Sequence, residues 1–420
     1  MLARHAVAVA DGKIEAVLPV DEAQRRFAGY ETVSLENHAL IPGLVNAHTH
    51  AAMTLLRGLA DDQPLERWLQ AHIWPAEQRH VSYEFVRDGA ALACVEMLRG
   101  GITCFNDMYM FPEASLESAL AAGLRSAHGI IVIEFATAYA SDPADYLRKG
   151  LELRDRYRDE PLASFCLAPH APYTVSDDSL KQVSTLAAEL DLPVHIHVHE
   201  TAGEIERSIA EHGVRPLERL RRLGLVGPNL IAVHAVHLDE LEIQLLARHG
   251  ATVAHCPSSN LKLASGFAPV ARLARAGVNL ALGTDGAASN NRLDMFQEMR
   301  TAALLAKGAT GDAGALPAHA ALRAATLGGA QAIGLGERIG SIVAGKLADL
   351  TAVRLDAPEL APCYDVASHL VYAAGREHVS HVWVAGEAQL FEGKLRNNVD
   401  TALQARVQLW QNALRPLAGP

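Results

Sequence analysis

The clearest structural signal in the chain is the stretch Pro42-Gly43-Leu44-Val45-Asn46-Ala47-His48-Thr49-His50, a Pro-Gly turn and a short apolar strand that ends in two histidines. From about residue 42 to residue 340, short apolar segments like this one alternate with longer amphipathic segments. This alternation is typical of βα units around a parallel sheet.

The pattern predicts eight such strands, enough for a closed barrel. They are expected at residues 44–48, 103–107, 126–132, 164–168, 194–198, 230–234, 252–255 and 279–284. Helices are expected between them, for example at residues 85–98, 144–156, 179–190, 238–248 and 292–305. Eight βα units in about 300 residues indicate an α/β fold of the (β/α)8 TIM-barrel type.

The two flanks of the barrel are expected to form one small β-sandwich domain. Short strands are predicted at residues 6–18 and 32–41 before the barrel, and at 346–353, 381–385 and 387–391 after it. The turn Ala385-Gly386-Glu387 favours a hairpin between the last two. The expected domains are therefore residues 1–41 plus 341–395 for the sandwich, 42–340 for the barrel and 396–420 for a C-terminal helix.

Composition excludes several classes of protein. Half of the residues are hydrophobic and a fifth are charged, as in a soluble globular protein, and no apolar run is long enough to span a membrane. The net charge of -11 and the lack of a Lys/Arg cluster argue against a nucleic-acid partner. Five scattered cysteines without a CxxC pair argue against disulfides and thiolate metal sites. We expect a cytoplasmic homo-oligomer that acts on a small molecule.

Two histidine clusters are candidates for metal binding. His48 and His50 are two residues apart, so an extended strand would direct both imidazoles to one face. An isolated pair of this kind is more often merely a polar strand end. In His195-Ile196-His197-Val198-His199, three alternating histidines on a buried strand would all need partners, which makes a purely structural role costly. Spacing alone does not choose among these three.

Further polar residues follow the later strands. His234 and His237 come after the strand at 230–234, and Asp285 follows the last barrel strand. An isolated aspartate there would more often be a helix cap, but these groups share the face where such barrels place their active sites. Imidazole and carboxylate ligands without thiolate suit zinc, with iron or manganese as alternatives. No lysine at the middle strand ends could bridge a second ion, so one divalent ion is expected.

Five motifs, in this order across nearly the whole chain, carry a family resemblance: PGLVNAHTH, HIHVHET, AVHAVH, HCPSSNLKL and GTDGAASNN. The sequence resembles the amidohydrolase superfamily, and more closely its methylthioadenosine/S-adenosylhomocysteine deaminases and their chlorotriazine-hydrolase relatives. The resemblance implies hydrolytic deamination of an adenine nucleoside to the inosine analogue and ammonia. The alternatives are deamination or dechlorination of another ring, such as guanine or a triazine, and a scaffold without catalytic activity.

The resemblance also implies roles for individual residues. It selects His197 as a ligand beside His48, His50 and Asp285, because the family places its catalytic glutamate three residues after that histidine, here Glu200. The resemblance likewise implies that Glu200 relays a proton from water to the ring nitrogen N1. Asp285 helps to protonate the departing ammonia, and His234 hydrogen-bonds the attacking water.

Substrate-binding residues are carried over in the same way. The segment that runs from Trp68 to Glu77 matches one in which the tryptophan lines the pocket and the glutamate binds the ribose hydroxyls. His170 matches a histidine that contacts the nucleoside, and Arg148 is the candidate for the carboxylate of S-adenosylhomocysteine.

The chain departs from the family pattern at Gly286 and in the loose alignment of Arg148 with a carboxylate-binding arginine, so methylthioadenosine or adenosine is expected to be preferred over S-adenosylhomocysteine. Relatives often carry serine where this chain has Gly286, so a hydrogen bond near Asp285 is expected to be missing. The chain also begins inside what is usually the second strand of the small domain, which leaves room for a longer native N-terminus.

Overall fold

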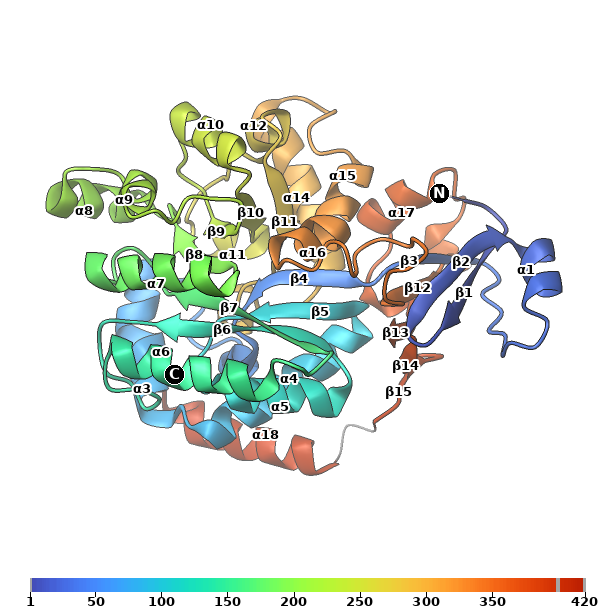
Figure 1. Ribbon diagram of the computed structural model, residues 1–420, viewed down its shortest axis with the longest axis horizontal. Helices are drawn as coiled ribbons and strands as arrows, with labels where there is room; N and C mark the ends of the chain where they lie inside the picture. The colour runs from blue at the N-terminus through green and yellow to red at the C-terminus, as the bar shows by residue number, and fades with distance from the viewer. Residues whose placement is uncertain (1, 398–400, 418–420) are drawn as a thin grey trace.

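Eight parallel strands form the centre of the molecule in the computed structural model, which describes residues 2–397 and 401–417 (Figure 1). Neighbouring strands pair in sequence order from first to last. They are β4 Leu44–Thr49, β5 Ile102–Asp107, β6 Arg125–Val132, β7 Ala163–Pro169, β8 Val194–Val198, β9 Leu230–His234, β10 Thr252–His255 and β11 Asn279–Leu282. The eight strands predicted from the sequence are thus confirmed, with small shifts at their ends.

The ring closes between β11 and β4. The backbone N–H of Asp285 donates to the carbonyl of His48 at 3.0 Å, and the Asn46 amide donates to the Thr284 hydroxyl at 2.7 Å. Gly283 permits this close approach, because a Cβ there would lie 2.8 Å from the Cβ of His48. The closure therefore brings together two motifs from opposite ends of the barrel sequence.

Helices follow the strands, and the longer of them cover the outside of the barrel (Figure 1). The helices are α4 Tyr83–Arg99, α5 Pro112–Ala122, α6 Pro143–Tyr157, α7 Asp177–Leu190, α8 Ala202–His212, α9 Pro216–Arg222, α10 Glu240–His249, α11 Pro257–Lys262, α12 Val270–Arg275, α13 Ala287–Asn290, α14 Met295–Thr310, α15 Ala318–Arg323 and α16 Gly329–Ala332. Outward residues of the strands, such as Val194 and Ile196 of β8, belong to the same buried core as Leu180 and Val183 of α7. This burial accounts for the apolar runs that mark the strands in the sequence.

A helical segment between β4 and α4 lies at the C-terminal ends of the strands. It consists of the 3-10 turn η1 Ala51–Leu56, α2 Leu65–Trp68, the π-helical turn η2 Leu69–Ile73 and α3 Trp74–His80. Its buried side chains, among them Trp68 and Ile73, form a second hydrophobic cluster with residues of the β5 and β6 loops. The segment thereby forms one wall above the barrel mouth.

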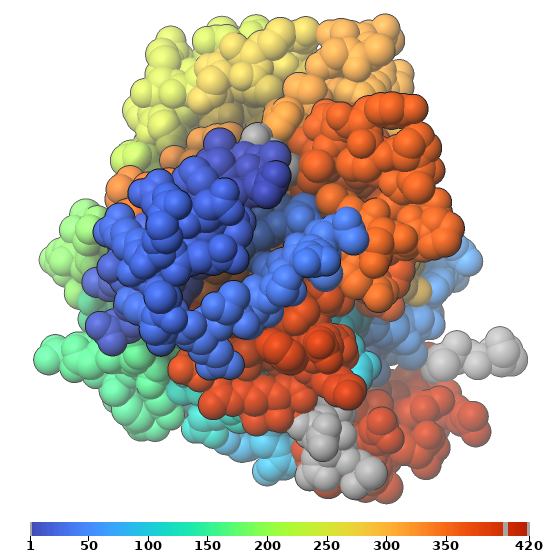
Figure 2. All heavy atoms as spheres, turned by 90° about the vertical axis from the view of Figure 1, so that its right-hand side faces the viewer, coloured from blue at the N-terminus to red at the C-terminus, as the bar shows by residue number. Residues whose placement is uncertain are grey.

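The flanks of the barrel meet in a smaller β region, which Figure 2 shows with the N-terminal segment against the C-terminal strands. One sheet has the order β15-β14-β13-β12-β3, and the hairpin β1–β2 packs on it. The strands are β1 His5–Ala10, β2 Lys13–Pro19, β3 His38–Pro42, β12 Leu350–Arg354, β13 Val379–Val384, β14 Glu387–Phe391 and β15 Lys394–Leu395. The β-sandwich from both flanks is confirmed.

Two details of this region differ from the sequence expectation. The strand predicted at 32–41 is limited to His38–Pro42, because only that part pairs with β12. A helix, α1 Val20–Arg26, follows β2 and was not predicted, since none of its residues is buried and its apolar pattern is weak.

A buried ion pair joins the barrel to the small β region. Arg125, the first residue of β6, donates from Nε and Nη2 to the carboxylate of Asp349 at 2.8 and 3.1 Å. Arg125 also donates to the Pro161 carbonyl, and Asp349 accepts from the backbone N–H of Ala385. Both side chains are at most 2% exposed, so each charge depends on the other for its solvation.

The C-terminal helix α18 Thr401–Leu414 packs against α4 on the outside of the barrel. Asp88 of α4 accepts hydrogen bonds from Arg406 Nε at 2.8 Å and from Trp410 Nε1 at 3.0 Å. The predicted C-terminal segment, 396–420, includes residues 398–400 and 418–420, which lie outside the described part. None of the helices in the described part of the chain has both the length and the apolar character that a membrane span requires.

Candidate metal centre

The sequence-predicted ligands lie at the C-terminal mouth of the barrel. His48 is in β4 and His50 directly follows that strand, while His197 is in β8 and Asp285 follows β11. All except His50 are buried, and the His50 side chain is only 13% exposed. Four polar groups from three strands thus meet in a region from which water is largely excluded.

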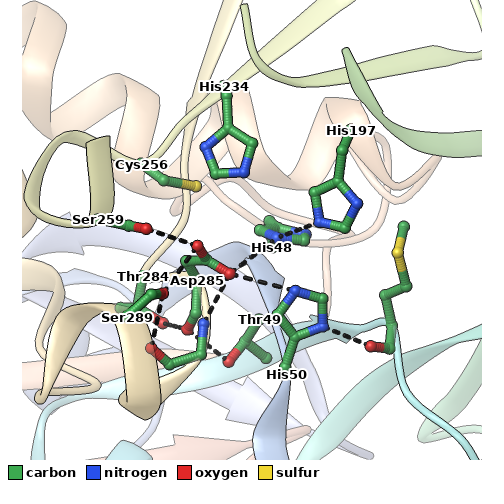
Figure 3. A network of polar contacts seen from close by, with 12 residues as sticks. His48, Thr49, His50, His197, His234, Cys256, Ser259, Thr284, Asp285 and Ser289 are labelled. Carbon is green, nitrogen blue, oxygen red and sulfur yellow. Dashed lines mark hydrogen bonds and ion pairs between the residues drawn. The ribbon is translucent and has the colours of Figure 1, made fainter. Parts of the chain in front are cut away.

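The side chains converge on one point (Figure 3). His48 Nε2 lies 3.2 Å from His197 Nε2 and 3.3 Å from Asp285 Oδ1, and His50 Nε2 lies 3.2 Å from the same Oδ1. The nitrogens of His48, His197 and His234 form one group whose atoms all lie within 4.8 Å of one another, and His48, His50 and Asp285 form a second.

The other ring nitrogen of each proposed ligand is held from outside the cluster. The contacts are His50 Nδ1 to the Met108 carbonyl at 2.5 Å, His197 Nδ1 to the His170 carbonyl at 2.7 Å and His48 Nδ1 to His195 Nε2 at 2.8 Å. A carbonyl can only accept, so the proton of His50 and of His197 sits on Nδ1 in the neutral ring and the Nε2 lone pair faces inward. This is the arrangement in which outer partners orient metal-binding histidines.

The Asp285 carboxylate is held by hydroxyl and backbone donors. Ser259 and Ser289 donate to Oδ2 at 2.6 and 2.9 Å, and the N–H of Gly286 donates to Oδ1 at 2.8 Å. Two serines therefore donate to this carboxylate, while Gly286 contributes its backbone N–H. A side chain at position 286 would meet Met53, since a Cβ there would lie 2.8 Å from its sulfur.

Burial and the mutual contacts set the protonation states of the cluster. Burial lowers the pKa of His48 to about 4 and that of His197 well below its usual value. Burial alone would raise the pKa of Asp285, but its hydrogen bonds with His48 and His50 hold it well below the usual range. Burial would likewise lower the pKa of His50, yet the contact with Asp285 raises it to about 9. Two neutral imidazoles and an ionised carboxylate are the forms that bind cations.

These residues fit a divalent cation. His197, whose Nδ1 proton is fixed by a carbonyl, presents the lone pair of its Nε2 toward His48 Nε2 at 3.2 Å. The nearby carboxylate provides the negative charge, and the donor set of imidazole nitrogen and carboxylate oxygen without thiolate is suited to zinc. A cation at this point would also replace the proton that His50 shares with Asp285.

Glu200 stands beside the cluster rather than within it. Its side chain is buried, Oε1 accepts from the Ser265 hydroxyl at 3.3 Å, and Oε2 lies 3.6 Å from His234 Nε2. Burial raises the pKa of the Glu200 carboxyl group above its usual value. His234 Nδ1 is 2.8 Å from the Asn260 side-chain oxygen, which orients Nε2 toward Glu200 and the cluster.

Of the three alternating histidines His195, His197 and His199, only the first two lie in β8. β8 ends at Val198, and His199 has a φ of 58°, which turns its side chain away from His195 and His197. His199 Nε2 accepts from the backbone N–H of Leu217 at 3.0 Å, and is therefore committed to holding the loop after α8.

A pocket opens above the cluster. Of the four substrate residues proposed from the sequence, Trp68, Glu77 and His170 line this pocket, together with Glu200 and Asp285. Burial raises the pKa of Glu77 to about 7, and Tyr109 donates to its Oε1 at 2.7 Å. The ring of Tyr109 is 6.3 Å from that of His50, so Glu77 is separated from the cluster by about one aromatic ring.

Arg148 is placed elsewhere. It lies on α6 with its side chain 54% exposed, and it is paired with Asp145 and Glu152 of the same helix. It does not line the pocket, so the structure gives no contact through which it could meet a ligand there.

Several residues of the site received no role from the sequence. Glu204 is buried and accepts from the backbone N–H groups of His199 and Glu200 at 3.0 and 2.9 Å, which fixes the turn that carries Glu200. Ser259 and Asn260 lie in the HCPSSNLKL motif directly after β10. Their position at the C-terminal end of a barrel strand is the signal that could have identified them.

Comparison with known proteins identifies similar chains. The sequence model of the amidohydrolase family matches residues 39–388. A protein of Teredinibacter turnerae named 5-methylthioadenosine/S-adenosylhomocysteine deaminase is 48% identical over 402 residues, which cover 96% of this chain and 91% of that protein. A 5'-deoxyadenosine deaminase of Methanothermobacter thermautotrophicus is 46% identical over 366 residues, covering 85% of this chain and 83% of that one.

A solved structure is also closely similar. It is described as an adenosine deaminase from Xanthomonas campestris with bound zinc, and it is 55% identical to this chain. The TM-score is 0.97, with 99% of this chain and 94% of the other covered.

Proposed function

Because this chain belongs to the amidohydrolase family, we propose that it is a metal-dependent deaminase that hydrolyses the 6-amino group of an adenine nucleoside. The products are the corresponding inosine analogue and ammonia. The names of the similar proteins support this proposal, since all three act on adenosine or on one of its 5′ derivatives.

One observation carries the proposal. His48, His50, His197 and Asp285 converge at the closed end of a pocket whose walls also present Glu200 and Glu77. The pocket thus combines a place for a cation, a buried carboxyl group beside it and a second carboxyl group one ring further out.

In this proposal His48, His50, His197 and Asp285 hold one divalent cation, with zinc as the first choice. Such a cation lowers the pKa of water and supplies a nucleophile near neutral pH. The bound zinc of the Xanthomonas protein supports this choice, with iron and manganese as alternatives.

The proposed catalytic roles follow from where the side chains lie. Glu200 takes a proton from the attacking water and gives it to N1 of the purine, which makes C6 more electrophilic. His234, oriented by Asn260, hydrogen-bonds the water and holds it in line with C6. Asp285, whose carboxylate is held by Ser259 and Ser289, takes up the second proton of the attacking water and passes it to the amino group as ammonia leaves.

The proposed binding roles belong to residues that line the pocket. Glu77 accepts hydrogen bonds from the ribose hydroxyls, because a carboxylate can accept from two neighbouring hydroxyls at once. Trp68 and His170 form the walls against which the nucleoside packs. Arg148 has no part in this proposal, because it is exposed and already paired on α6.

Ammonia release from a substrate panel tests the function. The panel contains 5′-methylthioadenosine, S-adenosylhomocysteine, adenosine, guanine and a chlorotriazine, and zinc is measured on the same sample. We expect turnover of adenine nucleosides in proportion to bound metal. Turnover of guanine or the triazine alone would refute the proposal.

The Glu200→Gln variant tests the proton relay. The amide keeps the size of the side chain but cannot exchange a proton, so kcat should fall by about 100-fold to 10,000-fold while zinc content stays at the wild-type level. Glu206→Gln is the matched control, because Glu206 is exposed on the neighbouring helix α8. A metal-replete Glu200→Gln enzyme with near-normal turnover would refute the assignment.

We also propose that the protein works as a homo-oligomer in the cytoplasm. All five cysteines are free and four of them are buried, which suits a reducing compartment. Light scattering coupled to size-exclusion chromatography tests the oligomeric state, and a single peak at the 45.0 kDa mass of one chain would contradict it.

A further inference from the structure

The substrate pocket changes character from its closed end to its opening. At the closed end lie the metal ligands and Glu200, which are almost fully buried. Toward the opening the walls become aromatic and aliphatic, with Leu69, Trp74 and Phe135 among the lining residues. The side chain of Phe135 is 47% exposed and therefore marks the outer edge.

The outer walls come from two elements that meet across the opening. Trp74 begins α3, and Phe135 lies in the loop after β6, and their rings make an edge contact with centroids 6.3 Å apart. Trp74 also precedes Glu77 by three residues on the same helix, so the two side chains lie on one face. A group bound just beyond Glu77 would therefore touch this aromatic pair.

The position of the 5′ substituent follows if the proposed function is correct, and this inference rests on it. With adenine at Glu200 and the ribose hydroxyls at Glu77, a 5′ substituent would extend along the remaining walls of the pocket, which include Trp74 and Phe135. A thioether sulfur makes favourable contacts with aromatic rings, and the burial of its methyl group is favourable as well.

Charges near the opening do not suit an amino-acid tail. Among the described residues that line the pocket there is no lysine or arginine, whereas Glu77, Glu200 and Asp285 are acidic. Arg207 stands outside, over the ring of the lining residue Tyr173, and is already paired with Glu66 at 3.1 Å. An ammonium and a carboxylate bound here would lose water without gaining a partner.

We propose that the outer half of this pocket is a 5′ subsite for small uncharged groups, with Trp74 and Phe135 as the residues that determine specificity. The enzyme then prefers adenine nucleosides that carry a 5′-methylthio group or a 5′ hydrogen, and discriminates against a zwitterionic amino-acid tail.

Steady-state kinetics with three nucleosides test this proposal. We expect kcat/KM for 5′-methylthioadenosine to exceed that for S-adenosylhomocysteine by at least about tenfold, since an unpaired buried polar group costs 1–3 kcal/mol. 5′-Deoxyadenosine should lie close to 5′-methylthioadenosine. In the Phe135→Arg variant the ratio should move toward S-adenosylhomocysteine, while the neutral Phe135→Met variant, which removes the ring without adding a charge, should keep the ratio well above that of Phe135→Arg.

The outcomes separate this inference from the proposed function. If no adenine nucleoside is deaminated, the proposed function fails, and the subsite with it. If all three nucleosides are deaminated but kcat/KM for S-adenosylhomocysteine equals that for 5′-methylthioadenosine, only the subsite proposal fails. The subsite proposal also fails if Arg207→Ala selectively lowers kcat/KM for S-adenosylhomocysteine, because Arg207 would then bind the carboxylate of that substrate.

An independent observation concerns His195, which the proposed mechanism does not use. It is fully buried in β8, and its Nε2 lies 2.8 Å from Nδ1 of His48. Its own Nδ1 has no hydrogen-bond partner among the described residues. A buried histidine with a single polar contact, and that contact to a proposed metal ligand, calls for an explanation beyond packing.

The contact determines which nitrogen of His48 is free. To present a lone pair on Nε2, neutral His48 must carry its proton on Nδ1, and His195 Nε2 is the acceptor for that proton. The proton of His195 then sits on its Nδ1. We infer that His195 is a positioning residue that fixes the tautomer and ring orientation of His48 for cation binding.

Zinc affinity, measured by competition with a chromophoric chelator, tests this role without reference to activity. His195→Leu removes the acceptor and should weaken zinc binding by about 10-fold to 100-fold. His195→Gln can accept through its amide oxygen and should stay within a few-fold of wild type. The matched control is His128→Leu, which replaces another buried barrel histidine, bonded to Ser126 instead of a ligand.

The comparison of variants decides the question even if one of them does not fold. If His195→Leu is insoluble, His195→Asn takes its place, because the shorter amide does not reach His48. Wild-type zinc affinity in the Leu or Asn variant would overturn the inference. Equal weakening in His195→Gln and His128→Leu would also overturn it, since the effect would then be one of packing.

Discussion

The buried pair of Arg125 and Asp349 should make a large and measurable contribution to stability. Replacing Asp349 with alanine leaves the guanidinium of Arg125 in a site where its side chain is 2% exposed, with the Pro161 carbonyl as its remaining acceptor. Removing one member of a buried ion pair costs about 3–5 kcal/mol. The N–H of Ala385 also loses its acceptor, which adds to the loss.

Urea unfolding of zinc-saturated protein, followed by far-UV circular dichroism, measures this cost. Asp349→Asn is the conservative control, because its amide oxygen can still accept from Arg125 and from the N–H of Ala385. The double variant Arg125→Met/Asp349→Leu removes both charges and should recover most of the stability lost in Asp349→Ala, since a well-packed apolar pair can replace a buried ion pair.

Two results would refute this reasoning. One is a loss of less than about 1 kcal/mol in Asp349→Ala, which is the range of an exposed ion pair. The other is a double variant that is no more stable than Asp349→Ala, because the cost would then come from lost packing and not from an uncompensated charge.

Three further predictions concern the site and its surroundings. Glu77→Ala should lower kcat/KM for adenosine by about 10-fold to 100-fold, because a hydrogen bond to a charged group contributes about 1.5–3 kcal/mol. The value for adenine should change little. A wild-type enzyme that does not prefer adenosine over adenine would contradict the ribose-binding role of Glu77. Chelation should lower the melting temperature, and free zinc at about 100 times its Kd should restore about 2.7 kcal/mol; an unchanged melting temperature would argue against a folded-state metal site. Burial raises the pKa of Glu298 to about 7 from its usual 4.5, so the folded chain keeps a proton that the unfolded chain releases. The stability of wild type relative to Glu298→Gln should therefore be greatest below pH 4.5 and fall as the pH rises toward 7, and equal pH profiles in unfolding experiments would exclude this.

The barrel could be predicted from the sequence because its strands are buried on both faces. Apolar runs such as the one that ends in His48 follow directly from that burial, and turns punctuate them. The strands of the flanking β region were harder to predict from the sequence, because half-exposed strands have a weaker hydrophobic pattern. The segment at 32–41 has the composition of a longer strand, but only His38–Pro42 finds a partner in β12.

The candidate site, too, could be predicted from the sequence only in part. Its location could be predicted, since polar residues after barrel strands meet at one mouth. The choice among His195, His197 and His199 could not, because it depends on a φ of 58° at His199 and on a contact between His195 and His48 across the barrel. Spacing along one strand does not reveal either feature, and the resemblance to a family was needed to select His197.

The pairing of β3 with β12 has a consequence for biosynthesis. The strand His38–Pro42 leaves the ribosome early, but its partner Leu350–Arg354 emerges only after the entire barrel has been translated. At about 5–20 residues per second this delay is on the order of half a minute. During that time a nascent strand with an open edge, ending at the histidine motif, is available to wrong partners, so protection by a chaperone at the exit tunnel would benefit this chain.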